Sequence, residues 1–69
     1  MKTIGRSIAE ARKAAKMTQR ELSWESGYSI GSIAGWENDR HVPSRRAIKA
    51  LEEALGATLA PDQGERRVG

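Results

Sequence analysis

The fold is decided by residues 18–37, which have the sequence TQRELSWESGYSIGSIAGWE. Thr18 is a residue type that favours a helix N-cap, and Glu21 follows it at the three-residue spacing of a capping box. This pattern predicts a short helix that begins directly after Thr18 and turns Leu22 inward. Gly27 is the expected end of this helix.

A second short helix is predicted after that glycine. Ser29 is a favourable N-cap, and Ile33 and Trp36 follow it at helical spacing. Asn38 and Asp39 then suit the left-handed position at a helix end. Two short helices joined by a three-residue turn that contains glycine form a helix-turn-helix unit. On spacing alone, any small helical bundle can contain such a corner.

The segments on both sides of this stretch also have helical spacing. A first helix, which should end near Lys16, is indicated by apolar residues at steps of three and four, namely Ile4, Ile8, Ala11 and Ala15. A fourth helix, capped by Ser44 and ended by Gly56, would turn inward Ile48, Leu51 and Leu55. No alternation of apolar and polar residues predicts a strand. We therefore expect a compact all-α domain of four to five helices.

Length and composition limit what the chain can be. Its 69 residues suffice for one domain, and a chain of this size buries only about 60% of its unfolded surface. The absence of Cys excludes disulfides, thiolate zinc sites and a thiol nucleophile. We expect a domain over residues 1–57 and a flexible C-terminal tail over residues 58–69, where Pro61 and Gly64 accompany few large apolar residues.

The charge distribution is more informative than the net charge. Twelve Lys and Arg against nine Asp and Glu give +3, which favours polyanionic partners only weakly. Residues 1–20 carry +5, residues 21–39 carry −4, residues 40–49 carry +4, and the remainder carries −2. Solvated helix faces explain any one of these blocks. Two basic blocks would matter if the fold brought them to one surface.

Four separated motifs carry a resemblance to a known family. They are Met17-Thr18-Gln19-Arg20-Glu21-Leu22, Gly27-Tyr28-Ser29, Ile33-Ala34-Gly35-Trp36-Glu37, and Pro43-Ser44 followed by Ile48, Leu51, Leu55 and Gly56. From about residue 4 to residue 57 the chain resembles the lambda-repressor-like (XRE, Cro/repressor) helix-turn-helix family of bacterial and phage transcription regulators. The resemblance implies sequence-specific binding of a double-stranded DNA operator through a recognition helix at about residues 30–38, placed in the major groove.

The resemblance also implies roles for individual residues. In the family an Arg of the first helix pairs with a Glu near the end of the recognition helix, and Arg12 and Glu37 occupy these places. Because Arg can bind a carboxylate with two hydrogen bonds, the pair would fix the angle between the first and third helices. The positions that correspond to DNA-backbone contacts are Thr18, Gln19, Ser29, Asn38, Arg40, Ser44, Arg45 and Arg46. A solvated side chain remains the alternative for each of them.

The recognition helix departs from the family where base contacts are expected. Relatives commonly have Gln, Ser, Arg or Lys there, whereas the candidate base-contacting residues of this chain are Ile30, Gly31, Ser32, Ala34 and Gly35. Ile30 and Ala34 could pack on thymine methyl groups, while the glycines let the backbone approach the groove. Alternatively, specificity comes from DNA shape or from a partner, or the surface binds protein instead.

Two further features concern partners. Trp24 lies two residues beyond the inward Leu22, and we favour its folding over the core edge rather than acting as an exposed contact. If it is a contact, the competing function is an antitoxin or antirepressor-type protein-interaction module on the same fold. Residues 57–60 are too few for the fifth helix through which relatives often pair. We therefore expect the free protein to be a monomer or a weak homodimer, with dimerisation promoted by DNA half-sites about one helical turn apart.

The sequence does not favour an enzyme. His41 is the sole histidine and lies in a basic loop, so neither a metal site nor a catalytic triad can be assembled. We expect no cofactor, no metal and no small-molecule ligand. No apolar stretch approaches the ~20 residues of a membrane span, and no signal peptide is evident, which favours a cytoplasmic, nucleoid-associated protein. The expected function is that of a small phage or bacterial repressor that occupies an operator and obstructs the polymerase.

Overall fold

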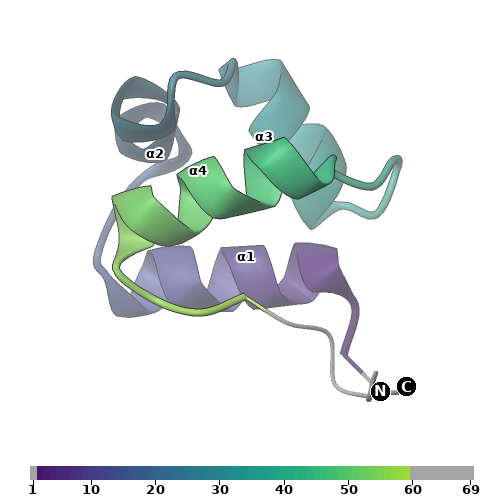
Figure 1. Ribbon diagram of the computed structural model, residues 1–69, viewed down its shortest axis with the longest axis horizontal. Coiled ribbons are helices and arrows are strands. Elements are labelled where there is room, and N and C mark those ends of the chain that lie inside the picture. Colours follow the sequence, from purple (N-terminus) through teal and green to yellow (C-terminus); the bar gives the residue numbers. More distant parts are fainter. Residues whose placement is uncertain (1, 60–69) are drawn as a thin grey trace.

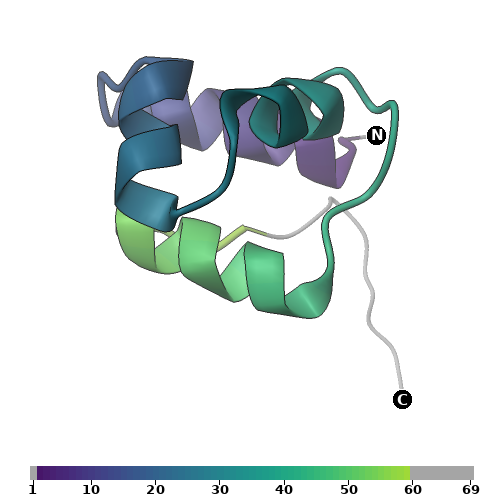
Figure 2. The same cartoon turned by 90° about the horizontal axis from the view of Figure 1, so that it is seen from above.

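The computed structural model describes residues 2–59 and contains four helices (Figure 1). They are α1 (Ile4–Ala14), α2 (Gln19–Ser26), α3 (Ile30–Glu37) and α4 (Arg45–Leu55). No strand occurs in this part of the chain, so the expectation of an all-α domain is confirmed. Figure 2 shows α4 on one side of the molecule and α1 with α3 on the other, while α2 spans from one side to the other.

Each helix begins at a side-chain N-cap. The hydroxyl group accepts a hydrogen bond of 3.0–3.1 Å from the N–H three residues later at Thr3, Thr18, Ser29 and Ser44. At Thr18 the capping box is complete, because its own N–H also donates to Oε1 of Glu21 over 2.8 Å. Such caps each contribute about 1 kcal/mol to helix stability. The predicted starts of α2, α3 and α4 are therefore confirmed, as are the ends of α2 and α4 at Gly27 and Gly56.

The end of α1 differs from the prediction. The helix stops at Ala14 rather than near Lys16. Lys16 has a φ of 59°, and its N–H donates to the Lys13 carbonyl over 2.9 Å. The N–H of Met17 reaches back to the Arg12 carbonyl over 3.0 Å. This pair of bonds is a Schellman motif, which ends a helix with a left-handed residue even where that residue is not glycine.

The same motif ends α3. Asp39 has a φ of 61°, and its N–H donates to the Trp36 carbonyl over 3.1 Å. The N–H of Arg40 donates to the Gly35 carbonyl over 2.9 Å. Of the two residues expected to suit the left-handed conformation, Asp39 adopts it and Asn38 does not, with a φ of −96°. The turn directs the chain back across α3 before α4 begins.

The core draws one large aliphatic side chain from each helix. Those that are completely buried are Ile8, Leu22, Ile33 and Leu51. Trp36 and Ala47 complete the centre, and Tyr28 packs against Trp36 with ring centroids 5.3 Å apart. Burying each large side chain contributes about 1.5–3 kcal/mol toward offsetting the conformational entropy lost on folding.

Leu59 corrects the predicted domain boundary. Its side chain is buried in the core, and its N–H donates to Oε2 of Glu52 over 2.9 Å. The packed domain therefore includes residue 59 rather than ending at residue 57. A core with so few large apolar residues gains from one more, and Glu52 supplies the hydrogen bond that the buried backbone group needs. The remaining part of the expected tail, residues 60–69, lies outside the described residues.

Gly5 lets α1 approach the end of α3 closely. A Cβ atom built on Gly5 would overlap the carbonyl oxygen of Trp36 and lie 2.7 Å from Oδ1 of Asp39. The first of these is a backbone atom of the Schellman turn and cannot move without disturbing the end of α3. Only glycine fits at this contact.

Replacing Gly5 with Ala should therefore lower the free energy of unfolding by about 2–3 kcal/mol, because overpacking against a backbone atom forces the two helices apart. Urea denaturation followed by circular dichroism measures this change. Gly31→Ala is the matched control, since the nearest atom to its new Cβ is Oγ of Ser29 at 3.9 Å. Alanine has the higher helix propensity, so the control should gain up to about 1 kcal/mol. Wild-type stability in Gly5→Ala would contradict the close contact.

Candidate nucleic-acid interface

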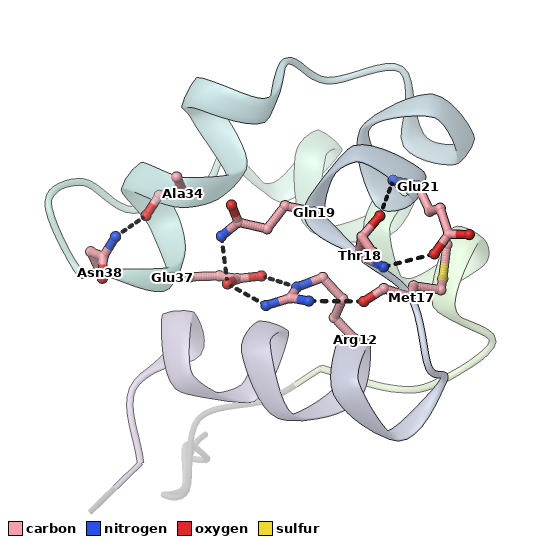
Figure 3. Close-up of polar contacts among 8 residues, drawn as sticks. All are labelled: Arg12, Met17, Thr18, Gln19, Glu21, Ala34, Glu37 and Asn38. Carbon is pink, nitrogen blue, oxygen red and sulfur yellow. Dashed lines mark hydrogen bonds and ion pairs between the residues drawn. The ribbon is translucent and has the colours of Figure 1, made fainter.

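A polar cluster of Arg12, Glu37 and Gln19 joins three helices (Figure 3). Arg12 donates from Nε to Oε2 of Glu37 over 2.8 Å and from Nη2 to Oε1 over 3.1 Å. Gln19 donates from Nε2 to the same Oε1 over 3.0 Å. The carboxylate at the last residue of α3 thus accepts bonds from α1 and from the first residue of α2. The ion pair lies at the two positions that the family resemblance pairs.

The ion pair is almost completely shielded from water. The side chains of Arg12 and Glu37 are only 13% and 7% exposed. Arg12 also donates from Nη1 to the Met17 carbonyl over 2.8 Å, so the guanidinium ties down the turn between α1 and α2. The hydrogen bonds that Arg12 donates to the Glu37 carboxylate raise the pKa of Arg12 above its ordinary value, although burial opposes this rise. Since both charges are partnered, their burial is tolerated, and the bidentate geometry sets how α1 and α3 meet.

The N-terminus of α2 is the first part of the expected backbone-contacting set. Thr18 is exposed, and its hydroxyl is committed to the capping box. The side chain of Gln19 is held by Glu37, as Figure 3 shows, but its amide keeps a second N–H. The N–H groups of the first helical turn have no carbonyl four residues earlier within the helix. They remain an anion-binding feature with a fixed orientation.

The outward face of α3 carries small and apolar residues. Ile30 is 40% exposed, Gly31 is exposed and Ala34 is half-buried. Asn38 follows on the same face, because positions four apart on a helix lie one above the other. Its Nδ2 donates to the Ala34 carbonyl over 2.9 Å and closes the end of the helix. This face therefore offers apolar contacts and little hydrogen bonding.

The other two candidate base-contacting residues are placed differently. Ser32 is half-buried, and its hydroxyl accepts a hydrogen bond from the hydroxyl of Ser29 over 3.0 Å. Gly35 is buried, because the imidazole ring of His41 lies against it. The space that was expected to admit a DNA groove at Gly35 is thus filled by the protein itself. Direct base contact at Gly35 stays a prediction, and it would require the imidazole of His41 to move aside.

The arginines of the loop and of α4 stand free. Near the N-terminus, Lys2 and Arg6 both bond to Glu10, which lowers the pKa of that exposed carboxyl. In contrast, the three arginines of the loop and of α4, namely Arg40, Arg45 and Arg46, are exposed and form no ion pair with any residue between 2 and 59. Ser44, which caps α4, lies directly between the first of them and the other two along the chain. Arg20 of α2 is likewise exposed and forms no ion pair within this range. These cations are available to an anionic partner.

The predicted packing of Trp24 over the edge of the core is wrong. The residue is 86% exposed on the outer side of α2, whereas the sequence favoured its folding over the core edge. Leu22 is the residue of this short helix that fills its inward position in the core. A shallow hollow of about 360 Å³ surrounds the indole and is lined by Arg20, Glu21, Trp24 and Glu25.

The seat of His41 on Gly35 is the contact that sequence reasoning missed. The available signal was a glycine inside a short helix six residues before the sole histidine.

No helix between residues 2 and 59 is long and apolar enough to cross a membrane. Over the same residues, no group of three or more His, Asp or Glu side chains is placed to hold a metal ion.

Comparisons with known proteins agree on the family. The model of a helix-turn-helix family matches residues 8–61. The chain is 35% identical over 63 residues to the immunity repressor protein of Bacillus phage phi105, which is 91% of this chain and 44% of that protein. It is 33% identical over 57 residues to multiprotein-bridging factor 1 of Candida albicans, which is 83% of this chain and 38% of that protein. The chain thus spans less than half the length of these curated relatives.

A solved structure gives the same result for the fold. The P22 c2 repressor, determined in complex with the synthetic operator 9T, superposes with a TM-score of 0.78 at 29% sequence identity. The match covers 84% of this chain and 88% of the repressor chain. The four-helix arrangement is therefore one that a repressor adopts when it is bound to operator DNA.

Replacing Glu37 with Ala tests the structural role of the ion pair. The variant leaves the Arg12 guanidinium buried with only the Met17 carbonyl as partner, so the free energy of unfolding should fall by about 3 kcal/mol. Thermal and urea unfolding measure the loss. Glu53→Ala, at an exposed position of α4, is the matched control and should change stability by less than about 0.5 kcal/mol. Equal stabilities of the two variants would show that the pair is dispensable.

Proposed function

We propose that this chain, which belongs to the lambda-repressor-like helix-turn-helix family, is a DNA-binding transcriptional regulator that occupies an operator. The observation that carries the proposal is the outward face of α3. This face carries the exposed Ile30 and Gly31 and the half-buried Ala34, and the Arg12–Glu37–Gln19 cluster holds it at a fixed angle to α2. A helix of this kind, rigidly placed beside a second helix, suits insertion into a major groove.

In the proposed complex, the outward face of α3 enters the major groove. Ile30 and Ala34 contact thymine methyl groups, and Gly31 lets the helix backbone approach the base edges. Ser32 lies beside them, with its hydroxyl already engaged by Ser29. Readout of this kind discriminates by shape and by methyl contacts rather than by bidentate hydrogen bonds. It favours A·T-containing sites over sites rich in guanine.

Phosphate contacts fix the position of the protein without reading sequence. The N–H groups at the start of α2 and the second amide N–H of Gln19 bind one phosphate. The exposed residues around the loop and the start of α4 bind the flanking backbone, and Arg45 is the residue we place nearest the minor groove. The full proposed backbone-contacting set is Thr18, Gln19, Ser29, Asn38, Arg40, Ser44, Arg45 and Arg46.

The biological role follows from this mode of binding. A small domain on an operator obstructs the polymerase, and the phage phi105 relative is itself named an immunity repressor. Two copies that bind half-sites about one helical turn apart would pair weakly on the DNA. We place such a repressor in the cytoplasm of a bacterial or phage-infected cell, on the nucleoid.

A second candidate function is a protein-interaction module. It is favoured by the 86% exposure of Trp24, since large aromatic side chains are common anchors of protein interfaces. Multiprotein-bridging factor 1, whose name describes contact with other proteins, is also among the relatives. A module of this kind would not need unpaired arginines in the loop and at the start of α4, which is why DNA binding is preferred.

The salt dependence of DNA binding distinguishes the two functions. If four to six phosphates are engaged, log affinity should fall with log salt at a slope of about −4 to −5 in mobility-shift titrations. The Arg45→Ala/Arg46→Ala double variant should bind more weakly on every sequence and flatten the slope by about 2. Trp24→Ala should bind as the wild type does. Absence of any shift at low salt, or a weakened Trp24→Ala with unaffected arginine variants, would favour the protein-interaction module.

Selection of bound sequences from random DNA tests the readout by α3. We expect thymine to be enriched at one or two positions of each half-site. Ile30→Ala removes most of the side chain that would contact the methyl group, so the binding free energy should weaken by roughly 1–2 kcal/mol. The preference for thymine should relax as well. Replacing thymine by uracil, which lacks the methyl group, should weaken the wild type more than Ile30→Ala, which keeps only the proposed contact of Ala34. Equal losses for both proteins would show that Ile30 does not contact the methyl group.

A further inference from the structure

The imidazole of His41 occupies the place where any other residue at position 35 would have its side chain. A Cβ atom built on Gly35 would overlap Nε2 of His41 and lie 3.0 Å from Cδ2 and 3.1 Å from Cε1. Gly35 is buried although His41 as a whole is exposed. One part of the ring therefore covers the bare backbone of α3, while the rest remains open to solvent.

The ring is also in contact with the aromatic part of the core. His41 meets Trp36 edge-on, with ring centroids 6.2 Å apart and planes at 73°. Trp36 is itself buried and also packs against Tyr28, with ring centroids 5.3 Å apart and ring planes at 65°. Edge-to-face pairs of this kind have a preferred geometry as well as a favourable energy. The position of the imidazole is thus defined by a rigid part of the molecule.

The contact determines where the loop between α3 and α4 lies. The Schellman turn ends at Arg40, His41 then packs on α3, and Pro43 is buried before Ser44 caps α4. Val42, between the two anchored residues, is 75% exposed. The loop is therefore attached to the protein at two residues, His41 and Pro43. Arg40 directly precedes the first of them, and Arg45 follows the second by two residues.

We propose that His41, seated on Gly35, is a positioning residue that sets where the unpaired arginines stand relative to the recognition helix. The proposal rests on the proposed DNA-binding function and deepens it. It gives Gly35 a reason to be glycine that has nothing to do with DNA approaching it. A glycine in a helix interior lowers helix stability, but here the missing side chain leaves room for the imidazole ring that anchors the loop.

A double-mutant cycle tests the contact. Gly35→Ala should displace the imidazole, His41→Ala should remove it, and the combined variant should lose no more DNA affinity than either single variant, because all three break one contact. Each should bind several-fold more weakly and flatten the salt slope by about 1 to 2, as one or two phosphate contacts are lost. Gly35→Ala should nevertheless melt at the wild-type temperature or above it, since alanine is the better helix former. Stability and affinity would then change in opposite directions.

His41→Phe separates ring packing from direct DNA contact by the imidazole. Phe keeps an aromatic ring against Gly35 and Trp36 but has no hydrogen-bonding nitrogen, so it should restore most of the affinity that His41→Ala loses. Val42→Ala is the matched loop control and should bind as the wild type does. Additive losses in the cycle, or a His41→Phe variant as weak as His41→Ala, would overturn the positioning role.

Backbone amide NMR spectra of the free protein make the test independent of DNA. In His41→Ala and Gly35→Ala, the shifts of Arg40, Arg45 and Arg46 should move, whereas Val42→Ala should leave those of the arginines in place. Unmoved arginine shifts in both variants would refute the positioning of the loop even if DNA binding is intact. Conversely, a wild-type protein that fails to bind DNA, while these shifts move as expected, would refute the proposed function alone.

Discussion

The bidentate bond between Arg12 and Glu37 is the interaction on which the geometry of the molecule depends. The core is small and contains no Phe, and its completely buried side chains are four aliphatic residues, so apolar packing alone sets helix angles loosely. A buried ion pair adds little net stability over apolar replacements, but it is satisfied in only one arrangement. Since Glu37 is also bonded by Gln19, one carboxylate sets the mutual positions of α1, α2 and α3.

The parts of the fold that the sequence predicts are those encoded locally. The N-caps at Thr18, Ser29 and Ser44 bond to their own helices within three residues, so residue type and spacing suffice to find them. Most inward positions follow from helical periodicity in the same way. The prediction that Ala15 belongs to the inward stripe of the first helix is wrong, because this residue follows the end of α1 and is exposed. The end of α1 was misplaced because a left-handed Lys16 has no distinctive sequence signal, unlike a left-handed glycine.

The parts that could not be predicted depend on contacts between distant segments. Leu59 is buried in the core, and Glu52, seven residues away, accepts the hydrogen bond of its N–H; a segment that contains Pro and Gly does not indicate this. Trp24 remains exposed because the small core is already filled by Leu22 at that helix. The role of Gly35 depends on the return of the chain six residues later. Each of these outcomes is decided by what occupies the neighbouring space, which composition and periodicity do not describe.

Gly31 and Gly35 show how this limits the reading of a candidate site. They are the same residue type, four positions apart on one helix, and a family comparison would assign both to the groove-facing surface. The structure leaves Gly31 exposed and covers Gly35 with His41, so the loop closes the C-terminal half of that face. What remains open is the N-terminal half with Ile30, which is the part that helix-turn-helix proteins direct at base edges. A short readable surface with few polar groups then requires the flanking phosphate contacts to be well placed, and His41 is the residue positioned to ensure this.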